Sequence, residues 1–163
     1  MARVSRYSLI PASYVYLLHD GQVLLQLRQN TGYMDGYWAA GAAGHVEPGE
    51  TAPQAAAREL LEELGLEVSL SDLVPSSVMH RTDGSDNPRE QRVEWFYSCS
   101  SWRGEPTIQE PRKCAELRWF PLTDLPPLLP DYERIALEWL RDHVGIGLLS
   151  VGFDAAPGRN DPL

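Results

Sequence analysis

Basic residues are scarce in this chain, which has 14 lysines and arginines against 23 aspartates and glutamates, for a net charge of −9. Proteins that hold duplex DNA or RNA need a broad basic surface for the phosphates, so this shortage argues against a binder of bulk nucleic acid. It does not exclude a phosphorylated small molecule, because bound divalent cations can reverse the charge of a local site.

Cysteines and long apolar segments are also few. Cys99 and Cys114 are the only cysteines, so they form neither a disulfide framework nor a metal-binding cluster, and they favour buried thiols in a reducing compartment. No segment approaches the roughly 20 apolar residues that span a membrane. The apolar stretch 9–18 is interrupted by Pro11 and Ser13, which is not typical of a secretion signal. We therefore expect a cytoplasmic protein.

The length of 163 residues suits one domain with a buried core. We expect residues 1–145 to form that single domain. Residues 146–163 are rich in glycine and proline, and we predict a poorly ordered C-terminal tail there.

Strands are predicted in five segments that are rich in apolar and aromatic residues: 13–19, 22–28, 73–80, 92–100 and 116–121. The pair Asp20-Gly21 between the first two is typical of a two-residue hairpin turn. Residues 131–143 form an amphipathic pattern that predicts a helix. Strands with a few helices and no regular alternation predict a mixed sheet with helices on its faces.

The segment 51–65 carries the start and stop signals of another helix. Thr51 can cap its N-terminus, Gln54 can complete a capping box, and Pro53 is tolerated in the first turn. The alanines and leucines that follow are strong helix formers. Gly65 ends the helix, as glycine commonly does just beyond a C-terminus.

Three carboxylates share one face of this helix. At about 100° per residue, Glu59, Glu62 and Glu63 fall within an arc of roughly 100°. A separate apolar stripe can pack on a sheet: Ala57, Leu60, Leu61 and Leu64. Like charges at this spacing destabilise a helix by roughly a few tenths of a kcal/mol per pair. A divalent cation is the simplest compensation, since Mg²⁺ prefers oxygen ligands. For the bare pattern, a solvated acidic face is the commoner explanation.

The neighbouring residues favour the metal. The segment 44–66 resembles the Nudix box, G-x5-E-x7-R-E-U-x-E-E-x-G-U, where U is a bulky aliphatic residue. Every fixed position matches: Gly44, Glu50, Arg58, Glu59, Leu60, Glu62, Glu63, Gly65 and Leu66. Shuffling this composition would produce such a match with a probability on the order of 10⁻⁷.

The resemblance to the MutT-like Nudix hydrolases implies an α/β/α sandwich with a mixed β-sheet and a catalytic loop–helix–loop. It implies Mg²⁺-dependent hydrolysis of the pyrophosphate linkage in a nucleoside triphosphate, or in a nucleoside diphosphate linked to another moiety, by a metal-activated water. Mn²⁺ is the expected substitute metal. The expected partner is a small nucleotide-type diphosphate, neither bulk nucleic acid nor a membrane, and the expected state is a monomer or a homodimer.

The resemblance also assigns metal ligands. Glu59, Glu62 and Glu63 are expected to bind the metal, together with the carbonyl of Ala43. Gly44 would let the backbone approach the metal closely. Glu59 is also the box residue expected to deprotonate the attacking water.

Other catalytic roles fall outside the acidic face. Arg58 and Glu50 resemble the pair that steers the catalytic carboxylates. Many family members use a further glutamate from a distal loop as a base or an extra ligand. Glu110 is the candidate for that glutamate, and Glu105 and Glu116 are weaker ones.

Three residues are candidates for substrate contacts. Arg28, at the end of a predicted strand, is suited to a phosphate, and it is equally suited to a solvated sheet edge. Tyr33 and Trp38 can stack on a base, whereas the alternative for each is a place in the core or at its rim. The run from Trp38 to Gly44 lacks the proline of the family's W-x-x-P-G-G pattern and is one residue longer, which affects substrate placement.

Two other functions compete with hydrolysis. A Nudix-fold module can sense a nucleotide without cleaving it, but members that lose catalysis typically lose box glutamates, and all are kept here. The isomerase branch of the fold acts on isopentenyl diphosphate and needs a catalytic cysteine before the box. Cys99 and Cys114 both follow the box.

Overall fold

The computed structural model of this protein describes residues 6–153. Strands in this part of the chain are β1 (Ile10–His19), β2 (Gln22–Arg28), β3 (Trp38–Ala40), β4 (Ala42–His45), β5 (Val74–Arg81), β6 (Arg92–Cys99), β7 (Cys114–Pro121) and β8 (Gly147–Val151). The α-helices are α1 (Ala52–Leu64) and α2 (Asp131–Asp142). Short 3₁₀ turns are η1 (Leu70–Asp72) and η2 (Pro88–Glu90).

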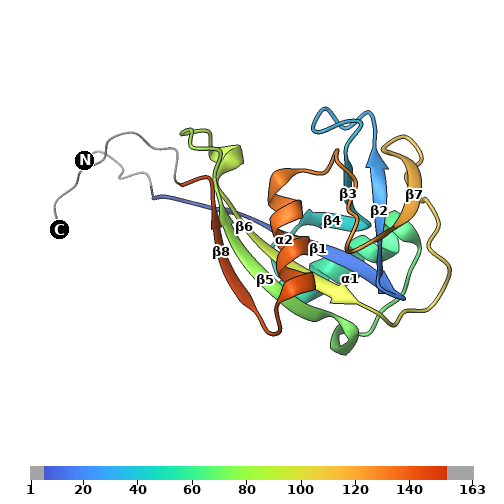
Figure 1. Ribbon diagram of the computed structural model, residues 1–163. Coiled ribbons are helices and arrows are strands. Elements are labelled where there is room, and N and C mark those ends of the chain that lie inside the picture. Colours follow the sequence, from blue (N-terminus) through green and yellow to red (C-terminus); the bar gives the residue numbers. More distant parts are fainter. Residues whose placement is uncertain (1–5, 154–163) are drawn as a thin grey trace.

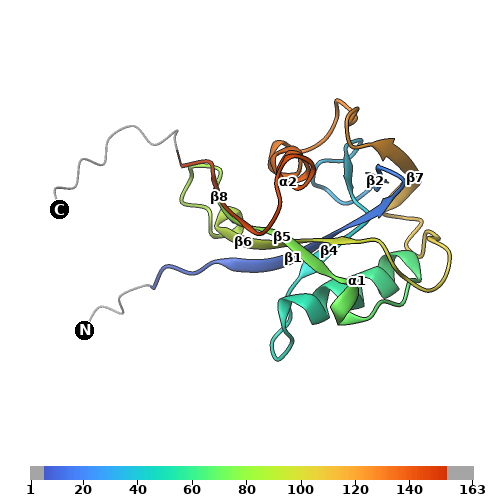
Figure 2. The same cartoon turned by 60° about the horizontal axis from the view of Figure 1, so that its bottom comes forward.

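All eight of these strands belong to one mixed sheet, in the order β3-β2-β1-β6-β5-β8, with β4 paired to β1 and β7 paired to β2. The pairs β1–β6 and β5–β8 are parallel, whereas the others are antiparallel. The two helices cover opposite faces of the sheet (Figure 1, Figure 2). The predicted α/β/α sandwich with a mixed sheet is confirmed.

Strand β1 divides the core because its side chains alternate between the two faces. Tyr16 is buried with Phe96 and Leu137 on the face that α2 covers. Val15 and Leu17 are buried on the opposite face, against α1. The predicted hairpin follows β1, and its turn residues have positive φ angles, 49° at Asp20 and 74° at Gly21, as a two-residue turn requires.

The predicted ends of α1 are confirmed. The Thr51 side chain accepts a hydrogen bond from the backbone N–H of Gln54, and the Gln54 side chain accepts one from the backbone N–H of Thr51. Gly65 closes the helix in the left-handed conformation, with φ 70°.

The predicted apolar stripe of α1 is displaced around the helix. The buried residues are Ala55, Ala56, Leu60 and Leu64, whereas Leu61 is 52% exposed. The helix is therefore rotated toward its glutamates, because small alanines allow close packing on that side. This rotation turns part of the acidic face inward.

The predicted tail is wrong at its start. Residues 147–151 form β8, which lies parallel to β5 at the edge of the sheet. Gly147 permits this, because a Cβ atom there would overlap the indole of Trp139 on α2. Residues 154–163 of the predicted tail lie outside the described residues. Within 6–153, neither helix is long and apolar enough to cross a membrane.

Candidate active site

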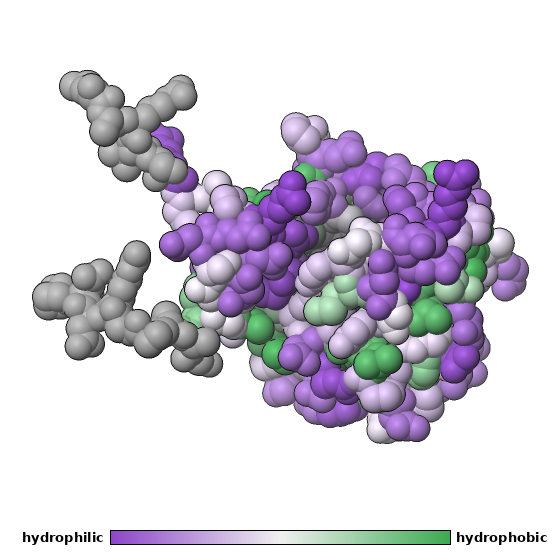
Figure 3. All heavy atoms as spheres, turned by 90° about the horizontal axis from the view of Figure 1, so that it is seen from above, coloured by the Kyte–Doolittle hydropathy of each residue, from purple (hydrophilic) through white to green (hydrophobic). Residues whose placement is uncertain are grey.

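A cavity of about 690 Å³ opens beside the C-terminal part of β4 and reaches the start of α2. The walls combine the loop 30–33, the strands β3 and β4, Glu63 of α1, the region from η2 to β6, the loop 110–113, and the start of α2. Figure 3 looks down on this end of the molecule, where hydrophilic side chains surround a hollow. The protein therefore places segments from across the whole chain around one polar cavity.

The glutamates of α1 have three different environments. Glu63 lines the cavity, and the side chain of Glu59 is only 13% exposed. Glu62 points outward, with its side chain 55% exposed. Burial raises the pKa of Glu59, although the neighbouring Arg58 opposes this. Two of the three carboxylates thus face the protein, which a freely solvated acidic face would not show.

Arg58 connects the acidic residues of the box. Its Nη2 and Nε donate to the two oxygens of Glu50 at 2.8 and 3.2 Å. Its Nη1 donates to Glu59 at 2.6 Å and to Glu62 at 3.3 Å, and its Nη2 also reaches the carbonyl of His45 at 3.0 Å. The structure brings Arg58 and Glu50 together as the box pattern implied, in a geometry that orients Glu59.

Glu63 is held by a residue that no motif indicated. The Nε2 of Gln26 donates to Glu63 Oε2 at 2.8 Å and to the carbonyl of Ala40 at 3.0 Å. The backbone N–H of Ala43 lies 3.4 Å from Glu63 Oε1. Gln26 escaped the sequence analysis because a single glutamine within a strand carries no signal, and only the pairing of β2 with β3 brings it here.

Burial raises the pKa of Glu63 to about 8, and the charges of Glu59 and Glu110 add to this effect. The hydrogen bonds from Gln26 and Ala43 act in the opposite direction. A buried carboxylate beside other carboxylates is unfavourable unless a cation compensates it.

Gly44 is the one position of the box at which any side chain would obstruct the site. A Cβ atom there would overlap the carboxylate of Glu59. Ala43, the preceding residue, lines the cavity next to Glu63. The absence of a side chain at Gly44 therefore lets the Glu59 carboxylate lie directly against the backbone of β4, and carboxylate and backbone oxygens grouped in this way suit a small divalent cation.

Within residues 6–153, no three His, Cys, Asp or Glu side chains already converge on one point, since Glu59 is turned to Arg58 and Glu62 to solvent. The donor set nevertheless fits a hard divalent cation. It consists of oxygen ligands on a helix and an adjoining strand, with the Glu59 carboxylate lying against Gly44 of that strand. The residues that could hold such a cation are Glu59, Glu63 and the Ala43 carbonyl, with Glu62 at the outer side.

Of the three distal glutamates considered, only Glu110 lines the cavity. Its Oε1 lies 3.1 Å from Lys113 Nζ, and its charge contributes to the raised pKa of Glu63. Glu116 instead pairs with Arg118, and Glu105 is exposed away from the cavity. The structure thus brings the preferred candidate to the box glutamates.

Two of the three candidate substrate contacts reach the cavity. Arg28 and Tyr33 both line it, with Arg28 Nε bonded to the Tyr33 carbonyl at 3.0 Å. Trp38 does not, because the pairing of β3 with β2 buries it edge-on against Phe120, with ring centroids 4.8 Å apart. Arg118 lies over its ring at 5.0 Å. The expectation that Trp38 stacks on a base is therefore wrong.

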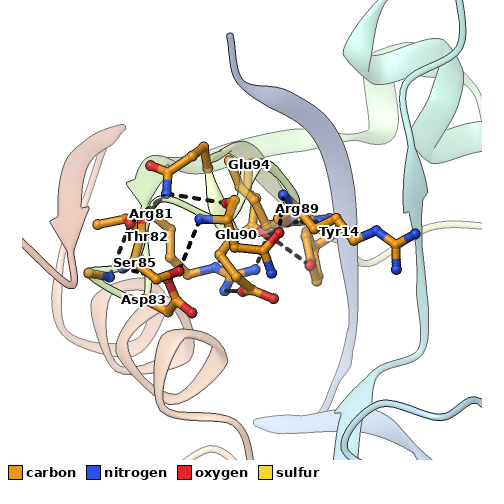
Figure 4. A network of polar contacts seen from close by, with 12 residues as sticks. Tyr14, Arg81, Thr82, Asp83, Ser85, Arg89, Glu90 and Glu94 are labelled. Atoms are coloured by element: carbon orange, nitrogen blue, oxygen red, sulfur yellow. Dashed lines mark hydrogen bonds and ion pairs between the residues drawn. The ribbon is translucent and has the colours of Figure 1, made fainter. Parts of the chain in front are cut away.

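The wall formed by β5 and β6 contains a buried ion pair that the sequence did not indicate. Arg81 donates to both oxygens of Glu94, at 3.1 and 2.8 Å, and Arg92 donates to Glu94 at 2.8 Å. Tyr14 donates to the same carboxylate at 3.1 Å. Figure 4 shows this network, with Tyr14, Arg81 and Glu94 meeting across neighbouring strands.

Neither cysteine lines this cavity. Cys99 and Cys114 are both buried, and burial raises the pKa of both thiols. A thiol with a raised pKa is a poor nucleophile. The functional groups that line the cavity therefore include carboxylates, amides and cationic side chains, and no thiols.

Comparison with known proteins identifies relatives over most of the chain. The family described as NUDIX domain matches residues 9–142. An isopentenyl-diphosphate Delta-isomerase of Cereibacter sphaeroides is 30% identical over 128 residues, which cover 78% of this chain and 72% of the isomerase. The NAD-capped RNA hydrolase NudC of Escherichia coli is 32% identical over 136 residues, or 83% of this chain and 48% of NudC. This chain thus spans about half the length of NudC.

A solved structure supports the same family. A MutT NUDIX hydrolase from Burkholderia pseudomallei superposes with a TM-score of 0.73 at 30% identity, covering 82% of this chain and 98% of that one. The match to the NUDIX domain, the complete box and this structural likeness together show that the chain belongs to the Nudix hydrolase family.

Proposed function

We propose that this protein hydrolyses the pyrophosphate linkage of a nucleoside triphosphate, or of a nucleoside diphosphate linked to another moiety, with Mg²⁺ as its metal and Mn²⁺ as a substitute. One observation carries the proposal. The carboxylates of Glu59 and Glu63 are turned inward, with Glu59 lying against Gly44 and Glu63 lining the cavity. A metal held by these carboxylates would polarise a phosphoryl oxygen and lower the pKa of the attacking water.

Each residue at this end of the cavity has a role that its contacts support. Arg58, fixed by both oxygens of Glu50, orients Glu59. Glu59 and Glu110 are the two candidates for the base that removes a proton from the water, since Glu110 lines the cavity and the Glu59 carboxylate lies against Gly44, which also lines it. The base must lie within hydrogen-bond reach of the water, and its pKa matters only once that condition is met.

Cations on the cavity wall suit a phosphorylated ligand. Arg28 and Lys113 line the cavity within the same region as Glu63 and Glu110. A chain with a net charge of −9 offers few such positions, so their placement beside the carboxylates is informative. Arg28 is suited to bind a phosphate oxygen that faces away from the metal.

The isomerase relatives raise the question of proton transfer to a carbon atom. The isomerase branch needs a cysteine before the box, and the cavity of this protein is lined by neither of its cysteines. The sensing-module alternative is disfavoured by the inward-turned box glutamates. Activity in the cytoplasm, as a monomer or a homodimer, stays a prediction.

The test is a substrate panel with Mg²⁺ or Mn²⁺. It contains nucleoside triphosphates, oxidised nucleotides, ADP-ribose, nucleotide sugars, dinucleoside polyphosphates, NAD and isopentenyl diphosphate. The variant Glu62→Gln/Glu63→Gln should lose at least about a hundredfold in rate, as the loss of a metal site implies. Glu105→Gln, which removes a glutamate outside the cavity, should keep the rate of the unmodified protein.

The outcomes separate the candidate functions. Cleavage that depends on the metal and on the two glutamates supports hydrolysis and names the substrate class; it releases pyrophosphate or phosphate from a triphosphate and two phosphorylated products from each of the other nucleotides. Isomerisation of isopentenyl diphosphate would overturn the proposal. Tight nucleotide binding without turnover would replace it with the sensing module.

A further inference from the structure

Two buried carboxylates, Glu94 of β6 and Glu133 of α2, differ in how many hydrogen bonds their oxygens accept. Glu94 is fully buried and accepts hydrogen bonds from Arg81, Arg92 and Tyr14 (Figure 4). Both of its oxygens are engaged by these donors. Glu94 is thus a saturated part of the wall and offers nothing to a ligand.

Glu133, on α2, is satisfied on one side only. Its side chain is 2% exposed, and its Oε2 accepts from the backbone N–H of Ala40 at 2.7 Å and from the hydroxyl of Tyr16 at 3.2 Å. No residue between 6 and 153 donates a hydrogen bond to its Oε1. Glu133 also lines the cavity, so the remaining oxygen is available from there.

Oε1 is not sealed inside the protein: among the described residues the buried side-chain polar atoms without a partner are Ser77 Oγ and Trp139 Nε1, whereas Glu133 lines the cavity. Burial raises the pKa of Glu133 to about 7, so Oε1 is an acceptor once the pH exceeds that value. The two side-chain hydrogen bonds of Arg28 go to the Tyr33 carbonyl and the Thr31 hydroxyl, and neither reaches Glu133. A partner for Oε1 can therefore come from a ligand in the cavity.

The position of Glu133 relative to the box end of the cavity follows from a short chain of hydrogen bonds. The peptide N–H of Ala40 donates to Glu133, and the carbonyl of Ala40 accepts from Gln26, which also donates to Glu63. One strand residue and one glutamine thus separate the two carboxyls. A ligand whose phosphates lie beside Glu63 would place its next chemical group near Glu133.

We propose that Glu133 is a specificity-determining residue, which accepts a hydrogen bond through Oε1 from a donor on the non-phosphate part of the substrate. This inference rests on the proposed pyrophosphate hydrolysis. The donor is a hydroxyl of the sugar or an amino group of the base. A site built to bond such a donor rejects analogues that lack it, because the buried acceptor is then left unpaired.

The variant Glu133→Gln tests this directly. The Ala40 N–H and the Tyr16 hydroxyl both require an acceptor, so the amide oxygen of the new side chain takes the place of Oε2. The amide NH₂ then faces the cavity, and the cavity-facing atom changes from an acceptor to a donor. Tyr16→Phe is the matched control, because it removes a bond to Oε2 and leaves the cavity-facing oxygen in place.

The substrates are pairs that differ in one donor group. Ribose against 2′-deoxyribose and 3′-deoxyribose forms the hydroxyl arm, and guanine against hypoxanthine and adenine against unsubstituted purine form the amino arm. In one arm, the protein should prefer the donor-bearing substrate by about tenfold or more in kcat/KM. Glu133→Gln should abolish or invert that ratio, whereas Tyr16→Phe should keep it.

Turnover with ratios near one in both arms would overturn the inference and leave the proposed function intact. The same holds if Glu133→Gln folds, as its unfolding midpoint shows, and keeps the original ratios. If Glu133→Gln does not fold, the ratios of the unmodified protein still decide between the two outcomes. Absence of cleavage of every nucleotide would overturn the proposed function and this inference together.

Discussion

Replacing Gln26 with methionine isolates one hydrogen bond to a box glutamate. The two side chains have similar length, but methionine cannot donate. The change removes the bond from Nε2 to Glu63 Oε2, at 2.8 Å, and the bond to the Ala40 carbonyl, at 3.0 Å. The rest of strand β2 keeps its backbone pairing with β3 and β7.

The magnitude follows from the charge on the acceptor. A hydrogen bond to a charged group contributes about 1.5–3 kcal/mol, which corresponds to roughly ten- to hundredfold in a binding constant. Partners that orient metal ligands typically have effects of about this size. We therefore expect Gln26→Met to weaken metal binding by about ten- to hundredfold, because Glu63 loses the donor that fixes Oε2.

Titration with Mn²⁺, followed by the EPR signal of the free ion, measures this affinity without any substrate. Gln22→Met is the matched control, since it makes the same replacement at the start of the same strand, outside the cavity. Denaturant unfolding establishes that both variants fold. A folded Gln26→Met protein whose Mn²⁺ affinity stays within about twofold of the original would refute the reasoning.

Three further predictions concern single side chains. Arg58→Lys should lower kcat/KM by about ten- to hundredfold with an unchanged circular dichroism spectrum, because lysine cannot hold both oxygens of Glu50; an unchanged rate would contradict this. Arg81→Met leaves the buried Glu94 undercompensated and should lower the free energy of unfolding by about 3–5 kcal/mol, whereas a urea midpoint close to the original would disprove it. The pKa of Glu133 is raised from 4.5 to about 7, so the folded state binds the proton of this carboxyl more tightly than the unfolded state does. The stability that this proton contributes is fully present below pH 4.5 and is lost as the pH rises to 7. The free energy of unfolding should therefore fall over this window by about 3 kcal/mol more than that of Glu133→Gln, and parallel pH curves for the two proteins would exclude it.

The elements that local signals specify were predicted well. The hairpin turn at Asp20-Gly21 and both ends of α1 are set by residues within a few positions of each other, so their sequence signals suffice. The box is also local, since its glutamates and its arginine lie on one helix and the loop before it. Its resemblance to the family was therefore visible without any tertiary information.

The rotation of α1 could not be predicted in the same way. An amphipathic pattern offered Leu61 to the sheet, but the structure exposes Leu61 and buries Ala55 and Ala56. The shape of the sheet decides which face of α1 packs against it. Small residues are favoured at the contact where the backbones of helix and sheet approach closely. That choice turned Glu59 and Glu63 inward, so it decided what the acidic face could do.

Trp38 and the predicted tail show the same limit. Trp38 is near the box in sequence, yet strand pairing buries it against Phe120. Gly147 begins a strand because β5 offers an unpaired edge and Trp139 leaves room only for glycine. Both outcomes depend on partners more than seven positions away along the chain.

The sequence by itself determined the family, the residues of the box, the caps of its helix and the first hairpin, because each is written in residues that are close along the chain. Only the tertiary structure decided which glutamates face inward, that Gln26 and Glu133 line the same cavity, and that Glu94 is buried behind its wall. Those three side chains come from β2, β6 and α2. Their polar contacts depend on strand order and on the placement of α2, which no local pattern encodes.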